Sequence, residues 1–221
     1  VAELEAVALA GSTISRASLH NPAALARLDA RLGDTVVLEK AGEIIPQLVE
    51  VDRAQRPPES APYVFPANCP ECGTPAVFSE GRTEARCPNE YCAAKVRARI
   101  EHFADCVEIK GLGPATVALL VERGLVRDPS DLYALDREQL VALPGFGDKK
   151  AAALLAAIER SRRAELWRVI AGLGILRVGP VAAKELAARY GSLRQLASAP
   201  EIGGWLGASG KRELCVRLAE A

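Results

Sequence analysis

The chain has 221 residues, of which 49% are hydrophobic and 25% are charged, and its formal net charge at pH 7 is zero. This balance is typical of a globular protein, and no apolar run approaches the roughly 20 residues of a membrane-spanning helix. The neutral charge means that a polyanionic partner must be bound through local patches or backbone groups. The N-terminus has no signal-peptide pattern, so we expect a protein of the reducing cytosol with no membrane partner.

The first segment, residues 1–62, has the pattern of a small β-barrel. Residues 7–15 predict one strand that bends at Gly11. Asn21 and Pro22 are typical of the cap and the first position of a short helix. This helix separates the first strand from the β-rich runs that follow.

Two such runs lie at residues 35–40 and 44–51, with a glycine turn at residues 41–43 between them. Pro46 lies inside the second run and predicts an edge position or a bulge there. Short strands, a small helix and glycine corners together predict a five-stranded barrel of the OB type. The proline-rich residues 56–62 predict a linker that can act as a hinge.

Four cysteines follow in the pattern C-x2-C-x14-C-x4-C, at Cys69, Cys72, Cys87 and Cys92. Two close pairs of thiols can supply the four soft ligands of a tetrahedral zinc ion, and the spacing is close to that of zinc ribbons. The alternatives are two disulfides or four unrelated buried thiols. Because no other ligand or open position accompanies the thiols, we predict a structural four-cysteine zinc finger over residues 63–94.

The remaining residues, 95–221, contain a repeat. The pattern hydrophobic-x-Gly-hydrophobic-Gly occurs at residues 109–113 and again, 34 residues later, at residues 143–147. A third copy ends at Gly179 and has Arg177 in place of its first glycine. Each copy predicts a helix, a glycine hairpin and a second helix, and neighbouring copies would bury their apolar faces against one another.

A hairpin of this kind can bind a phosphate backbone. Its glycines allow close approach, its middle apolar residue fixes the loop, and the N-terminus of the second helix attracts an anion. The alternative is that the glycines only permit a tight turn between helices. The glycine-rich tail from Pro200 is a candidate for a fourth, distorted hairpin. The predicted DNA-contacting residues of the array are Gly111, Gly113, Gly145, Gly147, Lys149 and Gly179.

The order barrel, four-cysteine finger, tandem hairpins, together with the local strings at residues 15–21 and 40–46, resembles bacterial NAD-dependent DNA ligase. The resemblance covers about residues 1–199 and only the middle and C-terminal part of such an enzyme. It implies that the barrel lies on the minor groove near a nick, that the hairpins complete a clamp around the duplex, and that the zinc finger joins the two. The implied fold class is multidomain α+β, with the barrel, the finger and an all-α hairpin array in that order.

The resemblance also implies DNA contacts in the barrel. Lys40 occupies a position where the family usually has arginine, and a lysine there keeps the charge without the planar fork. Ile44 and Ile45 match an apolar pair that packs on the minor groove. A position in the strand core is an equally good interpretation of both isoleucines.

The chemistry of sealing a nick is expected to lie outside this sequence. Members of the family carry adenylate on the lysine of a Lys-x-Asp-Gly motif, and the sequence contains neither that motif nor a phosphate-binding Walker loop. No catalytic residue is therefore predicted, and NAD and Mg²⁺ are implied only for a parent enzyme with an N-terminal adenylation domain. We expect a monomeric, cytoplasmic, nucleoid-associated protein that binds nicked double-stranded DNA. The alternative is a non-enzymatic repair or recombination adaptor that binds duplex or junction DNA through its hairpins.

Overall fold

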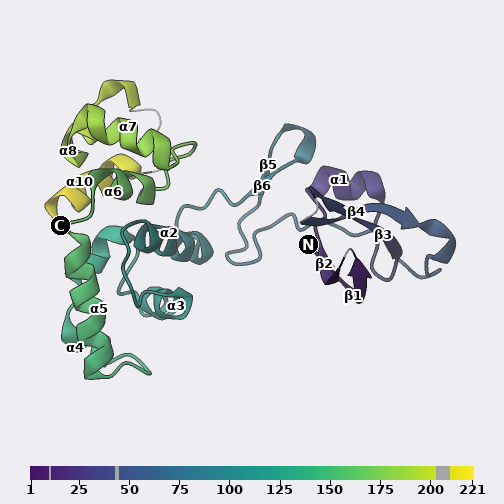
Figure 1. The fold of residues 1–221 in the computed structure, drawn as a ribbon, viewed down its shortest axis with the longest axis horizontal. Helices are drawn as coiled ribbons and strands as arrows, with labels where there is room; N and C mark the ends of the chain where they lie inside the picture. The colour runs from purple at the N-terminus through teal and green to yellow at the C-terminus, as the bar shows by residue number, and fades with distance from the viewer. Residues whose placement is uncertain (10, 43–44, 203–209) are drawn as a thin grey trace. The chain divides into compact units, whose positions relative to one another are not determined.

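The computed structural model describes residues 1–9, 11–42, 45–202 and 210–221 (Figure 1). The chain divides into two compact units, Val1–Asn89 and Glu90–Ala221. Over the described residues, none of the helices is long and apolar enough to cross a bilayer.

The first unit contains two strand hairpins, one helix and a small ribbon. Its elements in chain order are β1 (Ala2–Leu9), β2 (Ser12–Ala17), α1 (Pro22–Leu28), β3 (Thr35–Ala41), β4 (Ile45–Asp52), the 3₁₀ turn η1 (Arg53–Gln55), β5 (Val77–Phe78), the 3₁₀ turn η2 (Glu80–Arg82) and β6 (Ala85–Arg86).

The first hairpin corrects the prediction for residues 7–15, which expected one bent strand. The structure has two antiparallel strands there, with Val7 paired to Ile14 and Leu9 to Ser12. Gly11 has a φ of +77°, a left-handed conformation that reverses the chain direction instead of bending it. The sequence indicates a change of chain direction at Gly11, but it does not give the backbone φ angle that makes this change a reversal.

Helix α1 confirms the predicted cap. Asn21 Oδ1 accepts a hydrogen bond of 2.8 Å from the backbone N–H of Ala24, and Pro22 occupies the first turn, where a missing N–H costs nothing. The helix ends at Asp29, which adopts a left-handed φ of 50°.

The second hairpin confirms both predicted β-rich runs. β3 and β4 are antiparallel from the pair Thr35–Asp52 to the pair Ala41–Ile45. The register shifts between Val37 and Leu38, so the irregularity lies there and not at Pro46. On its other side β4 meets the end of β2, because Ser18 N donates to Pro46 O and Leu48 N donates to Ser18 O, at 2.8 and 3.2 Å. Within the described part of residues 1–62, these hairpins supply four of the five strands of an OB-fold.

The segment predicted as a linker, residues 56–62, is tied to the barrel. The Arg56 guanidinium donates to Asp29 Oδ2 at 2.7 Å and to both carboxylate oxygens of Asp34 at 2.9 Å. Arg31 donates to Ser60 O at 2.9 Å. Hydrogen bonds from Arg31 and Arg56 lower the pKa of the Asp29 carboxyl to about 2. A hinge that begins at Arg56 is therefore wrong for this part of the chain.

The second unit is helical and has two apolar clusters. Its elements are α2 (Ala93–Cys106), α3 (Pro114–Glu122), η3 (Pro129–Ala134), α4 (Arg137–Val141), α5 (Asp148–Ser161), α6 (Leu166–Gly172), α7 (Pro180–Tyr190), α8 (Leu193–Ser198), η4 (Pro200–Ile202) and α10 (Lys211–Glu220).

One cluster is built from side chains of α2 to α5 and includes Phe103 and Leu120, and the other joins α6, α7, α8 and α10. The helices α2 and α6 pack closely, since a Cβ placed on Gly172 would lie 2.9 Å from Cδ2 of Phe103. The predicted helices and hairpins are thus supported by continuous apolar packing. The tail predicted as a fourth hairpin depends on residues 203–209, which lie outside the described residues.

Candidate metal centre and nucleic-acid interface

The first cysteine pair sits in a tight backbone loop. Cys69 N donates to Thr74 O at 2.8 Å, and Gly73 N donates to Cys69 O at 2.9 Å. Gly73 has a φ of +71°, which a glycine adopts without strain. The loop turns Cys69 and Cys72 toward the same side.

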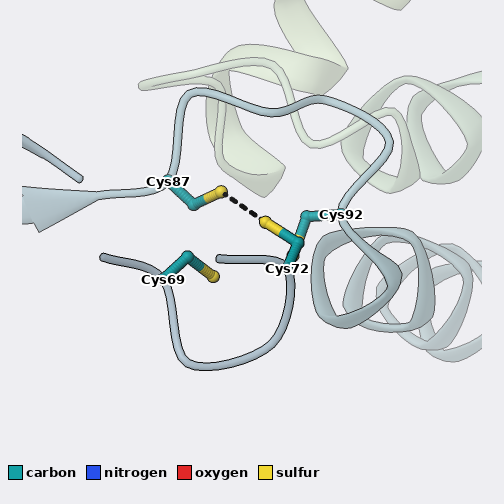
Figure 2. A group of neighbouring side chains, drawn as sticks. All are labelled: Cys69, Cys72, Cys87 and Cys92. Carbon is teal, nitrogen blue, oxygen red and sulfur yellow. Dashed lines mark hydrogen bonds between the residues drawn. The ribbon is translucent and has the colours of Figure 1, made fainter. Parts of the chain in front are cut away.

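The second pair flanks the short ribbon and the first helix of the second unit. Cys87 follows β6, and Cys92 immediately precedes α2. Figure 2 shows the four side chains converging, with Cys72 and Cys87 joined by a dashed line that marks a sulfur–sulfur distance of 3.5 Å.

All four Sγ atoms lie within 4.8 Å of one another. A tetrahedral zinc ion with Zn–S bonds of about 2.3 Å needs sulfur atoms about 3.8 Å apart, so the donor set fits zinc. The structure describes all six cysteines and joins none of them in a disulfide, which argues against the two-disulfide alternative. The grouping also rejects the alternative of four unrelated thiols.

The thiols differ in acidity. A hydrogen bond with the Thr74 hydroxyl lowers the pKa of Cys72 to about 6, whereas burial raises the pKa of Cys87 to about 12. Four thiolates at this spacing would repel one another strongly. A divalent cation removes that repulsion and deprotonates its ligands.

The segment around the cysteines has no apolar core of its own. Among residues 53–91, none of the side chains that the structure describes is buried, and Cys92 is the first buried side chain after Val51. Burial of apolar surface therefore supplies little of the free energy that folds this segment. Metal binding can supply the remaining folding free energy of this segment.

The glycine hairpins share one backbone geometry. Gly111 and Gly145 have φ values of +91° and +72°, and the middle residues Leu112 and Phe146 are buried as predicted. The third copy keeps this geometry although it lacks the glycine, because Arg177 adopts a φ of +67°. The sequence shows that arginine replaces the first glycine of this hairpin. It does not show that the left-handed backbone conformation is kept.

The helices that follow the hairpins begin without a side-chain cap. Gly113, Gly147 and Gly179 precede α3, α5 and α7, and none of them has a side-chain oxygen that could accept a hydrogen bond from the free backbone N–H groups. By contrast, Asp128 and Asp136 form complete capping boxes at the starts of η3 and α4. The helices that follow the hairpins thus keep backbone N–H groups without a side-chain acceptor, as α2, α6 and α10 also do.

Packing within the chain does not require these three glycines. A Cβ on Gly113, Gly147 or Gly179 would meet nothing within 4 Å, and their negative φ values suit any residue. A glycine at such a position leaves room for something outside the chain to approach the backbone.

The other predicted DNA contacts lie at two places. Lys40 and Ile45 lie at the same end of the β3–β4 hairpin, where Lys40 Nζ donates to Ser12 Oγ at 3.0 Å. The side chain of Ile45 is 59% exposed, so the strand-core interpretation is wrong for it, whereas Ile44 lies outside the described residues. Lys149 is exposed in the first turn of α5.

Comparison with family models identifies domains in four ranges of the chain. Residues 1–60 match the NAD-dependent DNA ligase OB-fold domain, and residues 68–94 match the NAD-dependent DNA ligase C4 zinc finger domain. Residues 103–160 match a SAM-like helix-hairpin-helix tandem, and residues 168–202 match a helix-hairpin-helix motif.

Curated relatives agree with these matches. The chain is 54% identical over 201 residues to DNA ligase 1 of Opitutus terrae, and the aligned region covers 90% of this chain and 30% of that protein. It is 47% identical to the DNA ligase of Gloeobacter violaceus over 90% of this chain and 30% of that protein. The chain thus spans about 30% of the length of these relatives. It belongs to the NAD-dependent DNA ligase family, of which it comprises the OB-fold, C4 zinc finger and helix-hairpin-helix domains.

Proposed function

We propose that this chain is the DNA-clamping part of an NAD-dependent DNA ligase that seals nicks in duplex DNA during replication and repair. The observation that carries the proposal is the threefold hairpin, whose left-handed tip and uncapped second helix recur at residues 109–113, 143–147 and 175–179. Three copies of one anion-binding geometry suit a polymer with regularly spaced phosphates.

The second hairpin illustrates the proposed contact. The first turn of α5 presents backbone N–H groups, and the exposed Lys149 adds a positive charge beside them. Asp148 in the same turn would repel a phosphate, but its carboxylate pairs with Arg137 at 2.7 Å, which offsets the charge. Lys150 lies 3.9 Å above the Phe146 ring and covers the residue that fixes the loop.

The barrel would supply a second contact through Lys40 and the exposed Ile45, with Ile44 beside it in the sequence. A cation next to apolar side chains suits the minor groove, where the cation approaches phosphates and the apolar groups pack on sugars. The hydrogen bond from Lys40 to Ser12 holds the lysine at this end of the hairpin.

Cys69, Cys72, Cys87 and Cys92 would hold a structural Zn²⁺ that folds the segment around them and takes no part in chemistry. NAD and Mg²⁺ would act with an adenylation domain on the same polypeptide. The whole polypeptide would be a monomer and would act at the nucleoid in the cytoplasm. The contribution of this chain to catalysis is to position the nicked ends.

A binding experiment with the 221-residue chain tests the proposal. We expect it to bind a nicked duplex with an affinity that falls steeply as salt is raised, because phosphate contacts release counterions. We also expect no transfer of adenylate from NAD to the chain. A salt-independent affinity would contradict the phosphate contacts, and a strong preference for a four-way junction over the nicked duplex would favour the adaptor.

A further inference from the structure

The tip of the third hairpin differs in chemistry from the first two. Leu176 and Val181 are large apolar side chains that are 68% and 75% exposed. The equivalent positions hold Lys110 and Ala115 in the first hairpin, and a proline and a lysine in the second. The third hairpin has therefore exchanged basic or small residues for two exposed apolar ones.

Arg177 stands between these positions and adopts a φ of +67°. This conformation is unfavourable for any residue with a Cβ, and glycine occupies it without strain in the other two hairpins. The Arg177 side chain is exposed, and among the described residues its guanidinium has no hydrogen bond, ion pair or ring contact. The arginine therefore costs the chain stability and gains no contact with the described residues in return, which points to a role outside the fold.

We propose that the third hairpin binds duplex DNA by inserting these side chains into the minor groove, whereas the first two hairpins bind phosphates through their backbone. This inference rests on the proposed function and refines it. Arg177 would lie in the groove, where the negative potential is strongest, and Leu176 and Val181 would pack against the deoxyribose walls on either side.

Two features favour the minor groove over another surface. A hairpin tip is narrow enough for a groove about 6 Å wide, whereas the major groove is read by a whole helix or a β-ribbon. Lys184 lies one turn after Val181 on the same face of α7, above the Trp167 ring at 4.8 Å, and is placed to meet a phosphate at the groove edge. The apolar Leu176 and Val181 would thus meet the sugars. The cation between them would enter the groove, and Lys184 would meet the phosphate at its edge.

The decisive variant is Arg177→Gly, because it restores the glycine of the other hairpins. It removes the backbone strain, so we expect the thermal unfolding temperature to stay the same or rise. If the side chain enters the groove, affinity for a nicked duplex falls about tenfold and the salt slope decreases by about one. If the hairpin bound through its backbone alone, Arg177→Gly would bind equally or more tightly, and that result would overturn the proposal.

The apolar contact is tested by Leu176→Ala combined with Val181→Ala. We expect about a fivefold loss of affinity with an unchanged salt slope, because no charge is removed. The matched controls are Val216→Ala, which shortens an exposed valine on α10, and Arg194→Ala on α8, and both should bind like the parent chain. An affinity of the double variant equal to that of the parent chain would contradict the apolar contact.

Competition identifies the groove. On an A·T-rich duplex, netropsin occupies the minor groove, and it should lower the affinity of the parent chain by a larger factor than that of Arg177→Gly. An equal factor for both chains would place Arg177 outside the groove. Failure of the parent chain to bind any duplex would instead overturn the proposed function itself.

Discussion

The helical unit and the segment around the cysteines are stabilised in different ways. The helical unit encloses two apolar clusters, in which Phe103, Ile100 and Leu120 are completely buried. Residues 53–91 have no buried side chain among those that the structure describes. A segment without a core cannot offset the conformational entropy that it loses on folding, so it depends on its metal and on hydrogen bonds. The two regions should therefore respond to different perturbations.

The largest expected effect is that of removing the metal. Zinc binding can supply about 10–16 kcal/mol to a site of this kind, so a chelator or Cys72→Ser should unfold the finger. Amide hydrogen exchange should show loss of protection in residues 69–87, while the cooperative thermal unfolding of the helical unit persists.

Cys106→Ser is the matched control, since Cys106 is a free thiol of α2 outside the four-sulfur group. It should bind zinc like the parent chain. A purified chain that is folded over residues 69–87 without any metal would contradict the comparison.

A substitution in the helical unit should destabilise that unit and leave zinc binding unchanged. Gly172→Ala places a Cβ 2.9 Å from the Phe103 ring and 3.3 Å from Cys106 Cβ, where helices α2 and α6 meet. Such overpacking costs about 1–3 kcal/mol, so thermal unfolding should occur at a lower temperature with the zinc content unchanged. An unchanged unfolding temperature would show that the contact between α2 and α6 is loose.

The barrel adds a smaller, pH-dependent effect. Asp29 has a folded-state pKa of about 2, below its ordinary value of 3.8, so its ion pairs stabilise the barrel above about pH 4. This stability is lost as the pH falls from about 4 through 2. Arg56→Gln should therefore shift acid unfolding of the barrel to higher pH, measured from amide NMR signals of β3 and β4. Arg53→Gln, an exposed neighbour in η1, should leave the midpoint unchanged, and equal midpoints for both variants would reject the role of Arg56.

The parts of the molecule that sequence could predict are those set by local geometry. The spacing of the four cysteines, the cap at Asn21 and the glycine hairpins each depend on a few neighbouring residues, and the structure confirms them. What could not be predicted depends on distant partners. Arg56 looked like the start of a linker because Asp29 and Asp34, which bind it, lie more than 20 residues earlier.

Exposure was equally hidden. The sequence leaves Ile45 equally compatible with a strand core and with an exposed contact, and only the folded arrangement shows that its side chain and that of Leu176 face outward. Arg177 is recognisable in the sequence as a missing glycine, but only the structure shows that it keeps the left-handed φ of +67° and that the next residue, Val178, is buried. An alignment of the three hairpins by position would have revealed the apolar pair at Leu176 and Val181 beforehand.

The most direct test of the account is the double variant Gly113→Ala and Gly147→Ala. Neither added methyl group meets a protein atom within 4 Å, so the chain should stay folded with nearly the same thermal unfolding temperature and zinc content. If phosphates approach the backbone there, the methyl groups stand in their way, and affinity for a nicked duplex should fall about tenfold or more because charge-assisted hydrogen bonds are lost. An affinity equal to that of the parent chain would contradict the account, since the hairpins would then be turns and nothing more.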